Sequence, residues 1–446
     1  MTTTHRLRIL GLLTPALMLG GTNSPPTFTR DVFPILQKTC VQCHRSGEMA
    51  PMPLTTYKEV RPWAAAIRET VLLRKMPPWY AEGPPGHFAN DWRLTDAEVS
   101  TISRWIDAHT PEGDLTDMPP ARHFTDGWLN GQPNLVLAIP KPVQIPASGN
   151  DLHPSFVFEH DFDQDTWVSG FEIRPDVRKI VHHANLNVVI PDPGKTVDWT
   201  TLQEKGERKE DHNFTIKSIH VGVPGRYAFQ TAKGVAVLLP KGSRLRIDLH
   251  YVAYGQPVVE QTKVGLYFAE GHIDQERRNY NFQYKALRIP PNTPDYYCAG
   301  TKTVPEPVTV QQVACHMHVR GRSYRIWAEL PDGREVELMS VPHYNFLWQQ
   351  QYELAEPVHL PKGSILHYEA HYDNSRSNSL LMQYDTPDRE VVWAERTIDE
   401  MMGGHVLHTV DSQRLDLTID GRTGHVVSRI VGRTVLPSAR AAGVFF

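Results

Sequence analysis

The chain has 446 residues, of which 40% are hydrophobic and 22% are charged, proportions of the ordinary globular class that allow two or three domains. Its formal net charge of −4 argues against a nucleic-acid-binding surface and against a polybasic membrane patch. We therefore expect small-molecule partners and no nucleic acid.

The chain begins with the segment MTTTHRLRILGLLTPALMLGG, which has two early arginines, an apolar stretch over residues 9–19 and two small residues behind it. This is the pattern of a secretory signal peptide, which we place at residues 1–23. A frayed hydrophobic N-terminus is the alternative. No later segment approaches about 18 uninterrupted apolar residues, so no membrane span is expected once the signal is removed. The sequence predicts a periplasmic or secreted protein.

The next feature is the motif CVQCH, which contains Cys40, Cys43 and His44. Two thiols at this spacing can add to the two vinyl groups of one haem, while the imidazole of the following histidine reaches the iron. The alternatives are a chance match and a zinc knuckle, but zinc would require a second ligand pair nearby, and the sequence has none there. The motif predicts one covalently bound haem c.

Helical signals surround this motif. Residues 29–39 place three apolar side chains on one face of a short helix that leads into it. Further on, a Thr-x-x-Glu capping box at 95–98 precedes an apolar helical stripe made of Val99, Ile102, Trp105 and Ile106. The segment resembles a small cytochrome c domain, which we place at residues 24–118 and expect to be all-α.

In that family the sixth iron ligand is usually a methionine in a loop beyond the haem motif. Met76, held between a lysine and two prolines in KMPPW, is the best match. Met49 and Met52 are rivals, and a packing role is the alternative for each of the three.

Beyond Gly113 the sequence becomes polar and proline-rich, which indicates an extended linker. From about residue 130, runs such as RLRIDLHYVAYG and RIWAELPDG alternate apolar and polar residues between turns. That alternation is typical of a β-sandwich.

An internal repeat indicates two such units. The segment LPKGSRLRIDLHY at 239–251 is echoed by LPKGSILHYEAHY at 360–372. The repeat predicts two related all-β domains in tandem. We place them at residues 119–288 and 289–433, followed by a tail at 434–446.

Two groups of histidines lie within these predicted domains. His182 and His183 are adjacent, and His250 ends a strand further on. His316 and His318 are two apart, so on a strand both rings would leave the same face and grip one ion. Imidazoles with a thioether indicate copper rather than calcium or magnesium. Each histidine alone would be a hydrogen-bonded core residue, but two groups in a repeated architecture favour metal.

At these residues the chain, over roughly 130–433, resembles the copper type II ascorbate-dependent monooxygenases, the family of peptidylglycine α-hydroxylating monooxygenase and dopamine β-monooxygenase. The resemblance implies two jelly-roll-like domains, each holding one copper across an open cleft. It implies an electron-transfer copper on His182, His183 and His250. It also implies an oxygen-binding copper on His316, His318 and Met401.

Met402 and His371 are the alternatives to Met401 as the third ligand of the second copper. The family's Glu-Glu-Met-Cys motif aligns without a gap with Asp399-Glu400-Met401-Met402, which favours Met401 over Met402. His371 is the repeat partner of His250 and would complete a three-imidazole site instead. The alternative role for His371 is that of a structural histidine at the end of a strand.

The chain also departs from the family. The arginine and tyrosine that hold a substrate carboxylate in the peptide-hydroxylating member are replaced by Ala314 and His405. Without that cation, glycine-extended peptides lose their charged anchor and are not expected as substrates. Most of the family's disulfides are absent, which leaves Cys298 and Cys315 as one candidate pair or as two free buried thiols.

We therefore expect an exported oxidoreductase that hydroxylates a small organic molecule with O2, using two coppers and one haem c that an external donor reduces. A non-catalytic periplasmic electron-transfer or copper-binding protein is the alternative. A carbohydrate-binding sandwich that carries a cytochrome is a weaker reading, because it leaves the histidines unexplained.

Overall fold

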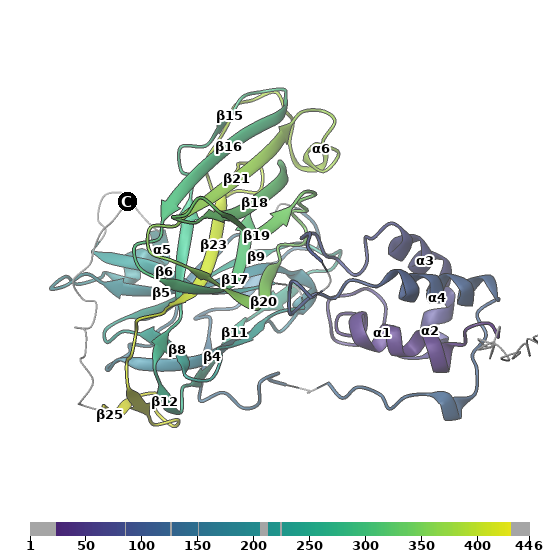
Figure 1. The fold of residues 1–446 in the computed structure, drawn as a ribbon, viewed down its shortest axis with the longest axis horizontal. Helices are drawn as coiled ribbons and strands as arrows, with labels where there is room; N and C mark the ends of the chain where they lie inside the picture. Colours follow the sequence, from purple (N-terminus) through teal and green to yellow (C-terminus); the bar gives the residue numbers. More distant parts are fainter. Residues whose placement is uncertain are drawn as a thin grey trace, which may run out of the picture.

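The computed structural model describes residues 24–84, 86–124, 127–149, 151–205, 213–223 and 225–429, and most of the regular structure is β-sheet (Figure 1). The predicted signal peptide (1–23) and the predicted tail (434–446) lie outside the described residues.

Most of the helices gather at the N-terminal end of the described chain, to one side of the sheets (Figure 1). Thr95 accepts the N–H of Glu98, and the Glu98 carboxylate accepts the N–H of Thr95, so the predicted capping box is confirmed. Phe28, Leu36, Ile102 and Trp105 are almost completely buried in a shared core. This helical part contains η1 (Phe28–Val32), α1 (Phe33–Thr39), α2 (Tyr57–Val60), η2 (Arg61–Trp63), α3 (Ala64–Leu72), α4 (Asp96–Asp107) and η3 (Leu115–Asp117).

Two sheets that share one core form what we call the first β unit. One has the order β1 (Leu135–Ala138), β11 (Lys263–Phe268), β4 (Thr166–Arg174), β8 (Val235–Leu239) and β13 (Gln275–Glu276), with β7 (Ala228–Gln230) also on β4. The other has the order β3 (Ser155–Val157), β9 (Arg244–Tyr251), β5 (Val181–Pro191) and β6 (Phe214–Gly222). Smaller elements are β2 (Val143–Ile145), β10 (Val258–Glu260), η4 (Arg178–Ile180) and α5 (Trp199–Lys205).

The second β unit is likewise a pair of sheets around one core. One has the order β14 (Arg278–Gln283), β23 (Gly403–Val410), β17 (Val308–His316) and β20 (Gln351–Leu360). The other has the order β16 (Thr293–Thr303), β21 (Ile365–Asn374), β18 (Gly321–Glu329) and β19 (Glu335–Val341). Smaller elements are β15 (Arg288–Ile289), β22 (Val391–Val392) and α6 (Leu381–Tyr384).

Two segments cross the boundary expected near residue 288. β14 precedes that boundary but pairs with β23 of the second β unit. β24 (Leu417–Ile419) pairs with β12 (Gly271–Ile273) and β25 (Val426–Arg429), and its leucine and isoleucine share a core with Trp167 of the first β unit. The two units are therefore interlaced at their ends.

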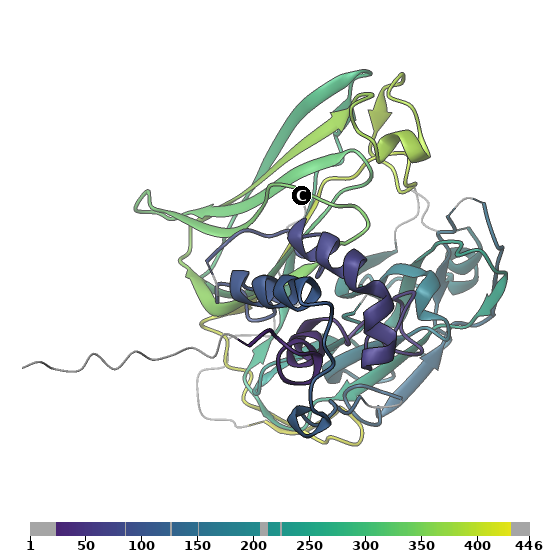
Figure 2. The same ribbon diagram turned by 90° about the vertical axis from the view of Figure 1, so that its right-hand side faces the viewer.

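The helical part touches both β units, and Figure 2 shows it in front of them. The Gln42 side chain donates to the Gly225 carbonyl, and Arg178 of the first β unit forms an ion pair with Glu48. Residues 79–84 and 86–92, which lie between α3 and α4, contact the second β unit, where Trp79, Ala81 and Phe88 join its core. This contact lies inside the predicted cytochrome segment, and no sequence pattern indicated it.

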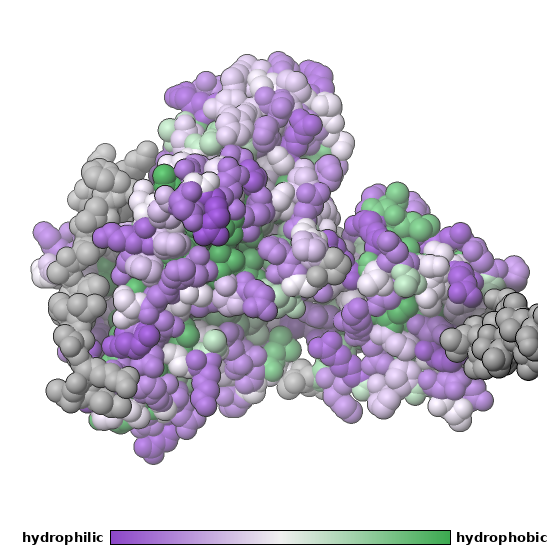
Figure 3. Space-filling view, viewed as in Figure 1, coloured by the Kyte–Doolittle hydropathy of each residue, from purple (hydrophilic) through white to green (hydrophobic). Residues whose placement is uncertain are grey.

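The surface in Figure 3 is mainly hydrophilic, with apolar patches that include part of the helical part, where Leu72 and Leu73 are exposed. Among the described residues, no helix has the length and apolar character needed to cross a membrane.

Candidate functional site

The first histidine group lies on β5 and β9, which pair antiparallel so that His183 stands opposite His250. Adjacent residues of a regular strand face opposite sides, but the register shifts between Val181 and His183, and both His182 and His183 approach His250. The ring centroids of His182 and His183 lie 4.6 and 5.1 Å from that of His250. One nitrogen from each of the three rings lies within 4.8 Å of the others.

The protonation of this group suits a metal ion. Desolvation is the largest cause that lowers the pKa of His182, to about 3, and it lowers the pKa of His183 well below its usual value. Nδ1 of His182 lies 3.1 Å from Nδ1 of His183. Nε2–H of His250 donates to Asp151 at 2.9 Å, which leaves Nδ1 of His250 buried with no partner among the described residues. The neutral rings of His182 and His183, together with the buried and unpartnered Nε2 of His182 and Nδ1 of His250, suit a transition-metal ion such as copper.

Asp151 also belongs to a second candidate group. Its carboxylate, His153 and His250 offer ligand atoms within 4.8 Å of one another, and the His153 ring lies 4.2 Å from the His250 ring. Thr397 of the second β unit donates to Asp151 at 3.4 Å. Asp151 therefore orients His250 and contacts both units, although no sequence pattern singled it out.

The second histidine group lies at the end of β17. The rings of His316 and His318 are 5.1 Å apart. Nδ1–H of His316 donates to Gln349 Oε1 at 2.6 Å, and Nδ1–H of His318 donates to the Asp399 carbonyl at 3.3 Å. These bonds engage Nδ1 of each ring and leave Nε2 as its candidate ligand atom. Desolvation lowers the pKa of His316 to about 4 and that of His318 well below its usual value, so both rings are neutral at pH 7.

Glu400 ties the methionine segment to this pair. Its buried carboxylate accepts the backbone N–H of His318 at 2.7 Å and that of Met401 at 3.0 Å. Met402 is completely buried in the second core, where its sulfur accepts the thiol of Cys298 at 3.2 Å. Met401 is only partly buried. Of the two sulfurs, that of Met402 is engaged in core packing, and that of Met401 remains the candidate metal ligand.

The other rival, His371, lies on the outer face of its sheet. β21 alternates buried and half-buried residues, and His371 falls in the half-buried set, where Nδ1–H donates to Asp295 at 2.8 Å. The two copies of the sequence repeat adopt the same local conformation. In each copy a serine hydroxyl donates to the carbonyl of a preceding proline, at 2.6 Å for Ser243 and 2.8 Å for Ser364. The two copies thus make the same turn, but only the first copy carries a histidine of the site.

The two histidine groups meet. The rings of His183 and His316 are 5.8 Å apart, and Phe346 lies 4.9 Å from His182 and 6.0 Å from His318. The described residues therefore form one continuous cluster with Phe346 beside both groups, rather than two groups on either side of an open cleft.

The positions that depart from the family's pattern lie close by. Ala314 stands opposite His405 in the pairing of β17 and β23. Desolvation lowers the pKa of His405 to about 4, and Asn279 donates to its Nδ1, so His405 supplies no positive charge at pH 7. Cys298 and Cys315 are both free and buried, so the candidate disulfide is absent in this structure.

The haem motif lies where the helical part faces the first β unit. Cys40 and Cys43 are free thiols, and Nδ1–H of His44 donates to the Met52 carbonyl at 3.1 Å, which leaves Nε2 to bind iron. This bond places the Met52 backbone on the His44 side of the motif, and the Met52 side chain packs on the helical core. Both features disfavour Met52 as the ligand on the opposite side.

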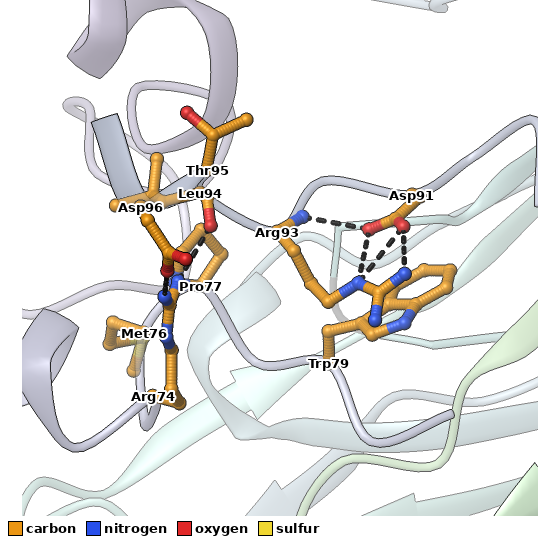
Figure 4. A pocket seen from close by; sticks show the side chains of 9 residues that line it. All are labelled: Arg74, Met76, Pro77, Trp79, Asp91, Arg93, Leu94, Thr95 and Asp96. Carbon is orange, nitrogen blue, oxygen red and sulfur yellow. Dashed lines mark hydrogen bonds and ion pairs between the residues drawn. The ribbon is translucent and has the colours of Figure 1, made fainter. Parts of the chain in front are cut away.

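Met76 lines a cavity of about 600 Å³ together with residues from the start of α4 (Figure 4). Arg74 pairs with Asp96 at its edge, and Arg93 pairs with Asp91 beside Trp79. Cys40, Cys43 and His44 do not line this cavity. The structure thus offers Met76 an open environment but does not bring it against His44, and Met76 as the iron ligand stays a prediction.

Comparisons with known proteins do not assign this chain. No family model matches the sequence, and no curated protein matches it. Among solved structures, the major capsid protein P2 of bacteriophage PM2 aligns at 10% identity with a TM-score of 0.23, over 62% of this chain and 97% of that one. The infectious bursal disease virus Gx strain aligns at 9% identity with a TM-score of 0.17, over 67% and 77% of the respective chains. Likenesses this weak carry no functional argument.

Proposed function

We propose that this chain is an exported haem- and copper-dependent monooxygenase that hydroxylates a small organic substrate with O2, built from a cytochrome c-like part and two jelly-roll-like copper domains. The observation that carries the proposal is the convergence of five histidines from two separate β units. Their rings are desolvated, and three of them are oriented by Asp151, Gln349 and the Asp399 carbonyl.

Each group of ligands has its own chemical character. His182, His183 and His250 offer three imidazoles, whereas His316, His318 and Met401 offer two imidazoles and a thioether, which favours Cu(I). Copper bound at these two sets supplies one-electron chemistry toward O2 and substrate. The protein's own contribution is to bury the rings, to fix which nitrogen of His250, His316 and His318 is left free, and to hold the Met401 backbone beside that of His318 through Glu400.

The motif at Cys40, Cys43 and His44 fits a covalent haem c, because both thiols are unpaired and His44 presents a free Nε2. A haem fused to the same chain supplies an internal one-electron carrier, fed by an external donor. Fusion raises the effective concentration of reductant at the copper ligands.

The walls beside the ligands indicate the class of substrate. Phe346 is buried against both histidine groups and packs with Val319 and Leu381. Ala314 and neutral His405 occupy the positions where the residues that hold a substrate carboxylate would be needed. An uncharged, largely apolar small molecule suits this environment better than an anionic peptide end.

A second candidate is a non-catalytic periplasmic electron-transfer or copper-binding protein. It is favoured by the closeness of His183 and His316, whose rings are 5.8 Å apart and leave little room for a substrate between the groups.

The deciding experiment is metal and haem analysis of protein expressed in the periplasm, followed by O2 uptake with a reduced donor and a library of neutral organic substrates. We expect one haem, two coppers and substrate-dependent O2 uptake with a hydroxylated product. Full loading without any product supports the electron-transfer candidate, and protein without haem or copper contradicts the proposal.

A further inference from the structure

Away from both histidine groups, three potential metal ligands converge where β12 pairs with β24. His272, Asp274 and Asp416 each offer one ligand atom, and these three atoms lie within 4.8 Å of one another. Nε2 of His272 is 3.2 Å from a carboxylate oxygen of Asp274. A tetrahedral zinc ion with bonds of about 2.1 Å separates its ligand atoms by about 3.4 Å. The first two ligands therefore already have a spacing close to the one that such an ion requires.

The register of the strands brings this group together. β12 and β24 are antiparallel, with His272 opposite Thr418, and they form a three-stranded sheet with β25 at the lower end of the first β unit in Figure 1. Side chains two residues apart on a strand leave the same face, which places His272 and Asp274 on one side of the sheet. Two residues further along the same register, Asp274 stands opposite Asp416. The three ligands thus come from two distant segments of the chain.

The two carboxylates lack the partners that buried acids normally have. Asp416 is only 7% exposed, and its side chain makes no hydrogen bond or ion pair with any of the described residues. Oδ1 of Asp274 is also buried without a partner among them, so that His272 is the single cation beside this carboxylate. Buried charges in proteins are paired or bind a metal. A divalent cation between the two carboxylates supplies the missing positive charge.

The donor atoms select the kind of metal. Calcium and magnesium prefer a shell made of oxygen atoms only, and the imidazole of His272 disfavours both. The group has no thiolate and no thioether, so it does not favour Cu(I). One imidazole and two carboxylates suit Zn²⁺, with water as the fourth ligand on the exposed side of His272.

We propose that His272, Asp274 and Asp416 bind a zinc ion that fastens together the two segments by which the chain passes between the β units. β12 precedes β14, which belongs to the second β unit, and β24 follows β23 of that unit and returns to the first. The ion joins the outgoing segment to the returning one. This inference goes beyond the proposed function and does not rest on haem or copper.

Neighbouring contacts hold the same two segments. The Gln275 side chain donates to the Val410 carbonyl at 3.1 Å, and the Glu276 N–H donates to the side chain of Gln413 at 2.6 Å. Asp274 lies directly before these residues, so its carboxylate is held in place next to the returning segment. The zinc ion therefore binds to a site whose two halves are already joined, and it adds stability to that junction.

The test uses the full-length protein, incubated with excess Zn²⁺ and freed of unbound metal by gel filtration, with zinc and copper measured by mass spectrometry. Asp416→Asn removes the buried carboxylate. His272→Gln removes the imidazole from an exposed position, so it leaves the core intact even if Asp416→Asn impairs folding. Asp420→Asn is the matched control, because it removes a nearby carboxylate that pairs with Arg422 and lies outside the group.

We expect the parent and Asp420→Asn to hold one more zinc per chain than either Asp416→Asn or His272→Gln. Zinc should also raise the Tm of the parent but not that of His272→Gln. All four proteins share the same copper ligands, so the difference in zinc content reports this site whatever those ligands hold. Equal zinc in the parent and His272→Gln, or loss of zinc from Asp420→Asn as well, overturns the site. Equal stabilisation of the parent by Ca²⁺ overturns the assignment to zinc. None of these outcomes alters the proposed function.

Discussion

The two histidine groups differ in the hydrogen-bond partners that orient their imidazole rings. In the first group, a carboxylate orients the ring, since Asp151 holds Nε2 of His250 and leaves Nδ1 free. In the second, neutral acceptors do so, since Gln349 and the Asp399 carbonyl hold Nδ1 of His316 and His318 and leave Nε2 free. A carboxylate makes its imidazole a stronger donor to the metal than an amide does. The two groups are therefore oriented by separate partners, although the rings of His183 and His316 are only 5.8 Å apart.

The largest expected effect comes from removing one ligand in each group. His183→Ala and His316→Ala should each lose one of the two predicted coppers, because neither group keeps enough ligands when one imidazole is removed. Mass-spectrometric metal analysis after dialysis measures this. If either variant loses both coppers, the rings that lie 5.8 Å apart act as one centre, and the comparison between separate groups fails.

The next effect concerns the thioether. Met401→His should keep its copper, because imidazole is also a good ligand, but should lose hydroxylation, because the soft ligand that favours Cu(I) is gone. Met402→Leu is the control, since Met402 lies in the core and should leave both copper content and product unchanged. Product analysis and copper content are measured together. Parental hydroxylation by both Met401→His and Met401→Ala would contradict the assignment and support the electron-transfer candidate.

A smaller effect on copper affinity is expected from Asp151 and Gln349, the residues that orient the histidines. Asp151→Ala should weaken copper at the first group, and Gln349→Leu should weaken copper at the second, each by about 10–100-fold, as is usual when a partner of a ligating histidine is removed. Competition with a copper chelator measures each affinity. Equal weakening of both groups by Asp151→Ala would indicate that its contact with Thr397 supports the second unit as well.

The smallest expected effect is the loss of folding stability of the two β units in acid. Desolvation lowers the pKa of buried His220 in the first unit to about 3 and that of His408 in the second to about 4. The folded protein therefore binds fewer protons than the unfolded chain below pH 6.5. Each histidine should reduce the free energy of unfolding by about 1.4 kcal/mol per pH unit as the pH falls from 6 toward the folded pKa.

Urea unfolding of the metal-free protein at pH 7, 6 and 5 measures this slope. His220→Gln should reduce the slope, because it removes the buried imidazole that must be protonated on unfolding. An unchanged slope in His220→Gln would show that His220 is not buried in its neutral form.

Local features were predictable from the sequence because they depend on neighbouring residues. The capping box at Thr95, the apolar stripe of α4 and the strand alternation of β18 all appear as expected. The repeat predicted two similar segments, and both copies make the same Pro-Lys-Gly-Ser turn, because the glycine after each lysine adopts positive φ, 79° at Gly242 and 88° at Gly363.

Residue types and spacings identify the candidate metal ligands, namely the histidine pairs, the methionines and the thiols of CVQCH. Which of these candidates converge depends on the tertiary structure. A register shift in β5 turns two adjacent histidines toward one point, packing with Cys298 commits Met402 to the core, and strand alternation turns His371 outward. Asp151 and Gln349 join the histidines through contacts between distant parts of the chain. Such contacts depend on strand pairing and side-chain packing, which residue type and spacing do not specify.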